Sequence, residues 1–382
     1  MPKIDGNRVF VWPEKSVVER DIFTRGSKLM ASPAVTSNAT ILRPEAWEWH
    51  LFGLINPFVV IAGNLLGGWF TATGVVYMLG IGPVLDVLLG KSDCRKRPSR
   101  DSGQPFEVML FAHALLQLLA VGTLLVLATS GSPVWTVVVA AVSTGINSGA
   151  SGLIVAHELG HRRKKSFSWW IAQLNLVSVL YLHFTTEHNR THHKHVATMA
   201  DPATARYGES VWWFVARTVP GQFLDAWRLH AARGHSPITN PVARGAACEV
   251  LLVVSIAVFL GPIPALAFLI QAASAVSLLE YINYLRHYGL QRDAGSRQTG
   301  AHSWQSENRW SRWTLLELTR HPAHHLEAGK PFWKLQPYDN APELPSGYYG
   351  CFWVALVPPL FRRLIHPRMP STNTLVVHEE AV

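Results

Sequence analysis

The sequence contains few cysteines, and its three cysteines are far apart: Cys94, Cys248 and Cys351. Cysteines in this number and spacing exclude a disulfide framework. They also exclude a built-in iron centre with four cysteine ligands. If the chemistry of this protein requires electrons, we therefore expect another protein to supply them.

Charged residues are also scarce, at 15% of the chain against about 25% in an ordinary globular domain. Hydrophobic residues make up 48%, and several runs approach the roughly 20 apolar residues that cross a bilayer core. We predict an all-α integral membrane protein with six transmembrane helices, at about 51–70, 71–89, 106–128, 134–156, 242–260 and 265–285. Two shorter apolar runs, Trp169–Leu182 and Tyr348–Phe361, are predicted to lie at the interface or pack on the bundle.

We expect no signal peptide at the start of this sequence, because no basic start is followed by an apolar core. The first 50 residues are polar and contain four prolines, so we expect residues 1–50 to form an N-terminal cytoplasmic tail. Residues 51–365 are predicted to form one membrane domain, and residues 366–382 a C-terminal tail.

Basic residues follow the second, fourth and sixth predicted helices, and such residues are retained on the cytoplasmic side of a membrane. They are Lys91, Arg95, Lys96, Arg97 and Arg100, then Arg162, Arg163, Lys164 and Lys165, and finally Arg286 and Arg292. We therefore predict a cytoplasmic cap made of residues 157–241 and 286–347. Both termini are expected in the cytoplasm, and the protein in a bacterial-type inner membrane. This topology signal accounts for most of the net charge of +9, although an acidic partner or anionic lipid would meet the same face.

Half of the 18 histidines fall into four short motifs at the ends of apolar stretches or between them. The motifs are HELGH (157–161), EHNRTHH (187–193), NYLRH (283–287) and RHPAHH (320–325). Nine imidazoles exceed the four ligands of a zinc site, so two metal ions are the simpler account. Imidazole is a good ligand for iron as well as for zinc.

The spacing within the motifs suits metal binding. His157 and His161, like His188 and His192, are four residues apart and would share one face of a helix. With His193, the second motif would present three imidazoles toward a shared centre. HELGH alone is also the zinc-protease signature, and single histidines at helix ends serve as caps or surface residues. The density of histidines over four motifs favours the metal centre.

Polar residues beside the motifs are candidates for orienting the ligating rings, because the second imidazole nitrogen commonly donates to a carboxylate or carbonyl. The candidates are Glu158, Glu187, Asp201, Glu280, Glu317, Asn283, His183, His195 and His302. For any one carboxylate, solubility or a salt bridge with an arginine is an equally good account.

Polar and small residues inside the predicted helices have structural explanations. His113 and Gln117 in the third helix predict hydrogen bonds between helices, although buried polar residues in membranes are often functional. Gly145, Gly149 and Gly152 in the fourth helix predict close helix packing, with room for a substrate as the alternative.

The motifs and their flanks resemble the membrane-bound alkane hydroxylases, which share a superfamily with xylene monooxygenase and, more distantly, the acyl desaturases. The likeness covers about residues 50–365 and is carried by HELGH, EHNRTHH followed by VATMADPATARYG, NYLRHYGL, HSWQS, and RHPAHH followed by NAPELPSGY. The resemblance implies a six-helix membrane fold and a non-haem diiron centre. Its implied ligands are His157, His161, His188, His192, His193, His287, His321, His324 and His325. It also implies O2 as cosubstrate, and electrons from a rubredoxin or ferredoxin with its reductase.

The implied reaction is hydroxylation of an unactivated terminal C–H bond of a hydrophobic hydrocarbon, from alkane to primary alcohol. Methyl hydroxylation of alkyl-aromatic compounds and fatty acyl desaturation stay open. An intramembrane zinc metalloprotease would leave the other seven motif histidines unexplained, and a metal transporter would spread its ligands through the membrane depth. The chain departs from the family at Arg286, where Glu is usual, and at Met199-Ala200, where Pro-Glu is usual. These departures leave the substrate open.

Overall fold

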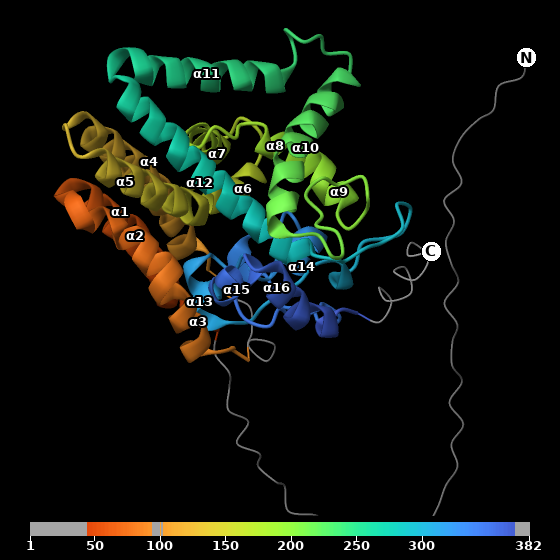
Figure 1. The fold of residues 1–382 in the computed structure, drawn as a ribbon. Coiled ribbons are helices and arrows are strands. Elements are labelled where there is room, and N and C mark those ends of the chain that lie inside the picture. The colour runs from red at the N-terminus through yellow and green to blue at the C-terminus, as the bar shows by residue number, and fades with distance from the viewer. Residues whose placement is uncertain (1–43, 94–99, 101, 371–382) are drawn as a thin grey trace, which may run out of the picture. The chain divides into compact units, whose positions relative to one another are not determined.

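The computed structural model describes residues 44–93, 100 and 102–370, all within one compact unit, Leu42–Val382. Within these residues the protein is helical, with two isolated β-bridges and no β-strand (Figure 1). The predicted tails before residue 44 and after residue 370, and the basic residues 95–97, lie outside the described residues.

The α-helices in chain order are α1 (Ile55–Leu66), α2 (Thr73–Val75), α3 (Gly82–Leu89), α4 (Gln104–Thr129), α5 (Val134–Asn147), α6 (Leu153–Gly160), α7 (Phe167–Val177), α8 (Phe184–Glu187), α9 (His193–His195), α10 (Val211–Ala231), α11 (Pro241–Phe259), α12 (Pro262–His287), α13 (Arg309–Thr314), α14 (His321–Leu326), α15 (Tyr348–Ala355) and α16 (Pro358–Ile365). The 3-10 segments are η1 (Trp47–Leu54), η2 (Gly68–Ala72), η7 (Gly300–His302), η8 (Phe332–Lys334) and η9 (His366–Arg368), and the π-helical segments are η3 (Val76–Ile81), η5 (Ser148–Gly152) and η6 (His188–His192).

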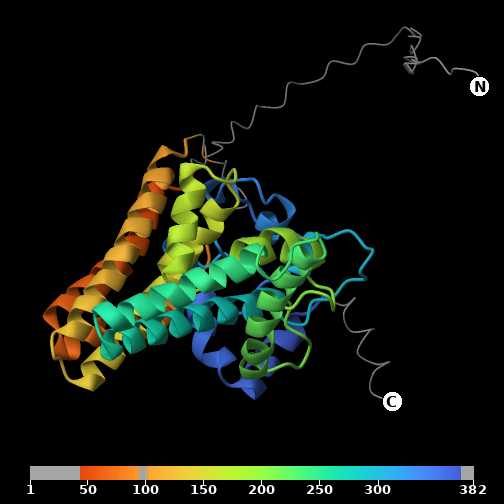
Figure 2. The same cartoon turned by 90° about the horizontal axis from the view of Figure 1, so that it is seen from above.

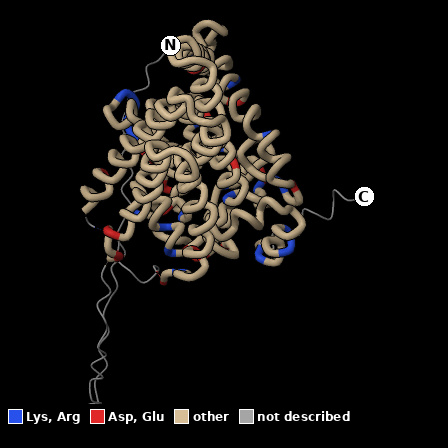
Figure 3. The backbone as a smooth tube through the Cα atoms, turned by 60° about the vertical axis from the view of Figure 1, so that its left-hand side comes forward, with Lys and Arg blue, Asp and Glu red and all other residues tan. Residues whose placement is uncertain are grey.

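Six of the resulting continuous helices are long and apolar enough to cross a membrane, which confirms the predicted fold class. They span Trp47–Leu66, Gly68–Leu89, Gln104–Thr129, Val134–Gly160, Pro241–Phe259 and Pro262–His287. The first span ends at Leu66, earlier than predicted, because Gly67 and Gly68 take positive φ angles of 69° and 54° that end the helix. Charged residues are sparse along much of the chain (Figure 3).

Polar contacts and close backbone approach hold the spans together. His113 Nδ1 lies 2.6 Å from Ser151 Oγ, and Gln117 donates to Ser148 Oγ at 2.7 Å, which confirms the predicted bonds between helices. A Cβ atom on Gly145 would overlap the Gln271 carbonyl of α12, so the predicted close packing is confirmed there. α12 also packs against α4, α10 and α11 (Figures 1 and 2).

The segments outside the spans cover the ends of α6 and α12. The two short apolar runs form α7, which packs on α6, and α15 with α16, of which α15 packs on α3. The 21-residue helix α10, in the predicted cap, was not anticipated. It begins after Ser210, whose side chain accepts from the Trp213 N–H, and its inner face packs on α12. α13 contacts η1 and α3, so the C-terminal quarter of the chain meets the first described residues.

Candidate metal centre and cavities

The four histidine motifs come together where several helices end. His157 lies in the last turn of α6, and His161 follows that helix. His188 and His192 bound the π-helical η6, while His287 is the last residue of α12. His193 is the first residue of α9, and the other three histidines come from the short helix α14, which starts at His321 and has Pro322 in its first turn.

A first histidine group consists of His157, His161, His188, His193 and His324. The ligand atoms of His157, His161, His188 and His324 all lie within 4.8 Å of one another. The Nε2 atom of His193 joins them, at 3.1 Å from Nε2 of His188 and 3.1 Å from Nε2 of His324. The two histidines of HELGH, which the spacing predicted on one helix face, therefore share one group.

A second histidine group consists of His192, His287, His321 and His325, whose ligand atoms also lie within 4.8 Å of one another. His321 Nε2 is 3.0 Å from His287 Nε2 and 2.8 Å from His325 Nε2. All four side chains are buried.

The two groups lie next to each other because neighbouring residues in the chain belong to different groups. His192 belongs to the second group and His193 to the first, while His324 belongs to the first and His325 to the second. In η6 the π-helical backbone brings residues five apart onto one face, so His188 pairs with His193 rather than with His192. The three imidazoles of EHNRTHH therefore do not share one group, contrary to expectation.

The ring nitrogen atoms of the first group are placed to bind a cation, because they cannot all form hydrogen bonds with one another. The Nε2 atoms of His188, His193 and His324 are mutually 3.1 to 3.4 Å apart. A ring nitrogen with a proton can only donate and one without a proton can only accept, so among three such atoms at least two are alike and repel. A cation between them would take all three lone pairs. Nε2 of His157 and Nε2 of His161 are buried without a hydrogen-bond partner.

Burial keeps these imidazoles neutral, which is the state that binds metal. Burial, followed by neighbouring histidines, lowers the pKa of His188, His193 and His325 well below the ordinary value. Burial alone lowers the pKa of His161 to about 4.

The predicted supporting residues differ in what they contact. Asp201 lies against His192, with Oδ2 2.9 Å from Nδ1. Glu187 completes a trio with these two residues, and burial, together with Asp201 and Glu280, raises its pKa well above the ordinary range. Asn283 donates to Glu280 at 3.1 Å, so these two residues bond each other.

The other candidates lie further from the histidine groups or contact backbone. Glu158 accepts from the Phe332 N–H at 3.3 Å and lines a small cavity beside His157 and His324. His302 closes a turn by accepting from the Thr299 N–H at 2.9 Å. His183 lines a cavity described below, and burial lowers its pKa to about 4.

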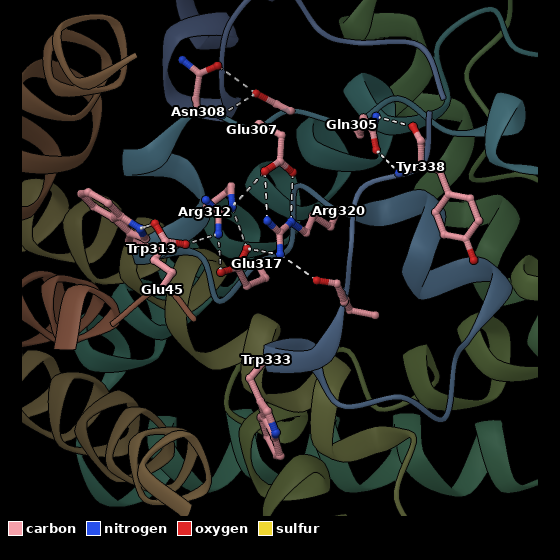
Figure 4. Close-up of polar contacts among 12 residues, drawn as sticks. Glu45, Gln305, Glu307, Asn308, Arg312, Trp313, Glu317, Arg320, Trp333 and Tyr338 are labelled. Carbon is pink, nitrogen blue, oxygen red and sulfur yellow. Dashed lines mark hydrogen bonds and ion pairs between the residues drawn. The ribbon is translucent and has the colours of Figure 1, made fainter. Parts of the chain in front are cut away.

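Glu317 belongs to a buried network of charges that supports α14 (Figure 4). Arg312 donates to Glu317 at 2.8 Å and also contacts Glu45, while Arg320 holds Glu307 through two bonds of 2.9 and 3.0 Å. Glu317 has a φ of 56°, a strained value for a residue with a side chain, and the arginines fix it there. Because Arg320 precedes His321, this network positions the α14 histidines.

His50 is a further buried member of the network, with Nε2 2.9 Å from Glu317 Oε1. Sequence reasoning missed His50, Arg312 and Glu307. The pair His50 and Glu317 is separated by 267 residues, and no local spacing indicates it.

An apolar cavity leads to the first histidine group. Met78, Leu153, Leu279 and Tyr349 line it together with His157 and Arg286. Its volume of about 40 Å³ holds only a few water-sized groups, so a hydrocarbon chain enters only if lining side chains move. Most of the lining side chains are aliphatic or aromatic, so the cavity suits apolar groups better than polar ones.

A second, basic cavity of about 590 Å³ reaches the same group from another side. Its lining includes Arg162, Lys164, Arg190 and Arg244 as well as His161. Positive charge beside a group histidine suits an anionic partner surface.

Comparisons with known proteins agree with this geometry. A family model described as fatty acid desaturase matches residues 133–355. The chain is 33% identical over 350 residues to alkane 1-monooxygenase 1 of Pseudomonas aeruginosa, covering 85% of this chain and 90% of that protein. It is 34% identical to alkane 1-monooxygenase 1 of Alcanivorax borkumensis, covering 79% of each. A xylene/toluene monooxygenase hydroxylase component of Pseudomonas putida is 30% identical over 57% of this chain and 60% of its own length.

Proposed function

Because the chain belongs to the alkane 1-monooxygenase family, within the wider fatty acid desaturase family, we propose that this membrane oxidoreductase converts an alkane to a primary alcohol. The reaction uses O2 and takes place at a diiron centre with nine histidine ligands. One observation carries the proposal: nine histidines from four distant motifs form two adjoining groups where an apolar cavity ends.

The first histidine group would hold one iron ion and the second group the other. When bound, the two ions would supply the reduction of O2 and the insertion of one oxygen atom into a C–H bond. An all-imidazole donor set suits iron.

The side chains around the histidines hold the ligating rings in place and exclude water from them. Asp201 holds the Nδ1 proton of His192, which leaves Nε2 of that ring with a lone pair. Arg320 and Glu307 fix the backbone just before His321. Met78 and Leu279 exclude water from the cavity, and they orient an apolar chain so that one end lies near His157.

We propose that both termini and the histidine motifs face the cytoplasm of a bacterial inner membrane, as the basic residues after alternate helices indicate. Electrons would come from a rubredoxin or ferredoxin with its reductase. The basic cavity beside His161 offers a cationic surface for such an acidic donor.

A second candidate is methyl hydroxylation of alkyl-substituted aromatic rings. The similarity to the xylene/toluene monooxygenase component favours it. A fatty acyl desaturase shares the metal chemistry, but it removes a second hydrogen instead of adding oxygen.

Product analysis tests the proposal. Cells that express this chain with a rubredoxin and a ferredoxin system are fed octane, hexadecane or p-xylene separately, and products are identified by gas chromatography and mass spectrometry. A primary alcohol from an alkane supports the proposal. A benzylic alcohol alone supports the second candidate, while an alkene supports desaturation. A His192→Ala, His324→Ala double variant is the control, and product from it would contradict the histidine assignment.

A further inference from the structure

The guanidinium of Arg286 lines the apolar cavity and forms no ion pair with a carboxylate of the described residues. Glu280 attracts it only from a distance, and its Cζ lies 5.7 Å from the centre of the Tyr348 ring. Arg286 is only 2% exposed, and its Nε donates to the Tyr348 hydroxyl at 3.2 Å. Among the described residues, neither terminal nitrogen of Arg286 makes a hydrogen bond or an ion pair. The other buried arginines differ: Arg312 is paired with Glu45 and Glu317, and Arg320 is paired with Glu307.

An arginine side chain stays charged at any physiological pH. A buried charge without a counterion is strongly unfavourable, and one that is paired and hydrogen-bonded is tolerated. A hydrocarbon has neither a negative charge nor a hydrogen-bond acceptor for these two nitrogens. The planar fork of a guanidinium matches a carboxylate, which it binds through two parallel hydrogen bonds.

The rest of the cavity complements the tail of such a ligand. Apart from His157, Arg286 and tyrosine hydroxyls, its walls are aliphatic and aromatic, with Met78, Leu153 and Leu279 among them. Arg286 lies at the last turn of the span Pro262–His287, whereas Met78 lies in the middle of the span Gly68–Leu89. An acid in a bilayer keeps its carboxylate near the surface and its tail in the core, so its orientation matches that of the cavity.

We propose that the cavity takes an amphipathic carboxylic acid, with the carboxylate on the terminal nitrogens of Arg286 and the hydrocarbon tail along the apolar wall. This inference rests on the proposed function and adds a substrate class to the same site. Because His157 and Arg286 line one cavity, the carbons next to the carboxylate lie closest to the first histidine group.

Oxidation then occurs near the acid end rather than at the terminal methyl group. One C–H bond breaks and one C–O bond forms, which gives a hydroxy acid. The second oxygen atom of O2 leaves as water, with two electrons from the reduced redox partner and two protons from solvent. For dodecanoate the product is a hydroxydodecanoate substituted in the half of the chain that bears the carboxylate.

The test measures binding on the full-length, iron-loaded protein in nanodiscs, with nanodiscs lacking protein as the partition control. Radiolabelled dodecanoate and dodecan-1-ol are the probes. We expect the wild type to bind dodecanoate at least tenfold more tightly than dodecan-1-ol. In Arg286→Gln this preference is lost, and in Arg286→Lys it is reduced, because lysine keeps the charge and loses the fork. Arg233→Gln, the same change at an exposed position, leaves both affinities unchanged.

Equal binding of the two probes by the wild type, or an unchanged preference in Arg286→Gln, overturns the inference. Thermal unfolding without ligand tests whether Arg286 stabilises the fold instead of binding a ligand. If the charge of Arg286 is unpaired until a ligand binds, Arg286→Gln unfolds at the same temperature as the wild type or at a higher one. A clearly lower unfolding temperature contradicts the inference. Turnover separates the two proposals: preferential dodecanoate binding without oxygenated product from dodecanoate or dodecane supports the binding site and contradicts the proposed oxygenase.

Discussion

The Nδ1 atom of His192 lies 2.9 Å from Oδ2 of Asp201, and both side chains are almost completely buried. Asp201 is itself fixed, because it accepts from the Thr204 hydroxyl at 2.6 Å and from the Ala203 N–H at 3.0 Å. A carboxylate held in this way keeps the proton of His192 on Nδ1, so that Nε2 faces the second histidine group with its lone pair free.

Replacing Asp201 with Asn should therefore weaken metal binding without removing a ligand. Loss of such a supporting carboxylate lowers metal affinity by roughly 10- to 100-fold. Titration of the iron-loaded protein with a chelator measures the change, and Asp293→Asn, at an exposed position, is the matched control. Equal iron retention in both variants would show that Asp201 does not act through His192.

The buried pair of Arg320 and Glu307 should contribute far more to stability than an exposed pair. Glu307→Gln leaves a buried arginine partly unpaired, and we expect a loss of about 3 to 5 kcal/mol in the free energy of unfolding. Glu327→Gln, which breaks the more exposed pair with Lys330, should cost about 1 kcal/mol or less. Unfolding of metal-free protein in mixed micelles compares the two, and similar losses would contradict the supporting role of the network.

The contribution of Glu317 to stability should depend on pH. Burial alone would raise its pKa, but Arg312 and Arg320 outweigh burial and hold the pKa well below the ordinary 4.5. Because the pKa is lowered in the folded state, ionised Glu317 stabilises the fold at pH values above its unfolded-state pKa near 4.5. This stabilisation disappears as the pH falls toward the folded-state pKa. Thermal unfolding of metal-free wild type and Glu317→Gln from pH 7 downward should show a difference that shrinks below about pH 4.5. A difference that stays constant over this range would contradict the ion-pair account.

A side chain at Gly149 should lower stability, because this residue lies where the cavity wall meets α12. A Cβ atom there would lie 2.9 Å from Cδ2 of Leu278 and 3.1 Å from the Ala275 carbonyl oxygen. We expect Gly149→Ala to lose about 1 to 3 kcal/mol of stability through overpacking and to lower turnover of long substrates. Gly122→Ala on α4 has nothing within 4 Å of its new atom and should be neutral or mildly stabilising. Thermal unfolding and product yield compare the two, and equal behaviour would contradict close packing at Gly149.

The sequence predicted the elements whose signals are local. Long apolar runs revealed the six spans. The four-residue spacing of His157 and His161 predicted one helix face, and the structure places both residues in one group. Helix α10 was not predicted because it lacks the uniform apolar run that identified the spans. It is amphipathic and has Pro220 in its interior.

The arrangement that depends on distant contacts could not be predicted. The division of His192 from His193 and of His324 from His325 follows from where η6 and α14 pack. The bond between His50 and Glu317 joins the first described helix to the segment before α14, and only the folded chain brings them together. Among the described residues Arg286 has no ion pair, and this too is invisible in the sequence, where Glu280 precedes Arg286 by less than two helical turns.

The central claim is that the two histidine groups hold two iron ions. Metal analysis of the purified protein, combined with Mössbauer spectroscopy after expression with ⁵⁷Fe, tests this claim most directly. We expect two iron ions per chain, one for each group, and loss of iron in a His324→Ala, His325→Ala double variant that removes one ligand from each. Zinc in place of iron, a single ion per chain, or iron content unaffected by the double variant would contradict the account.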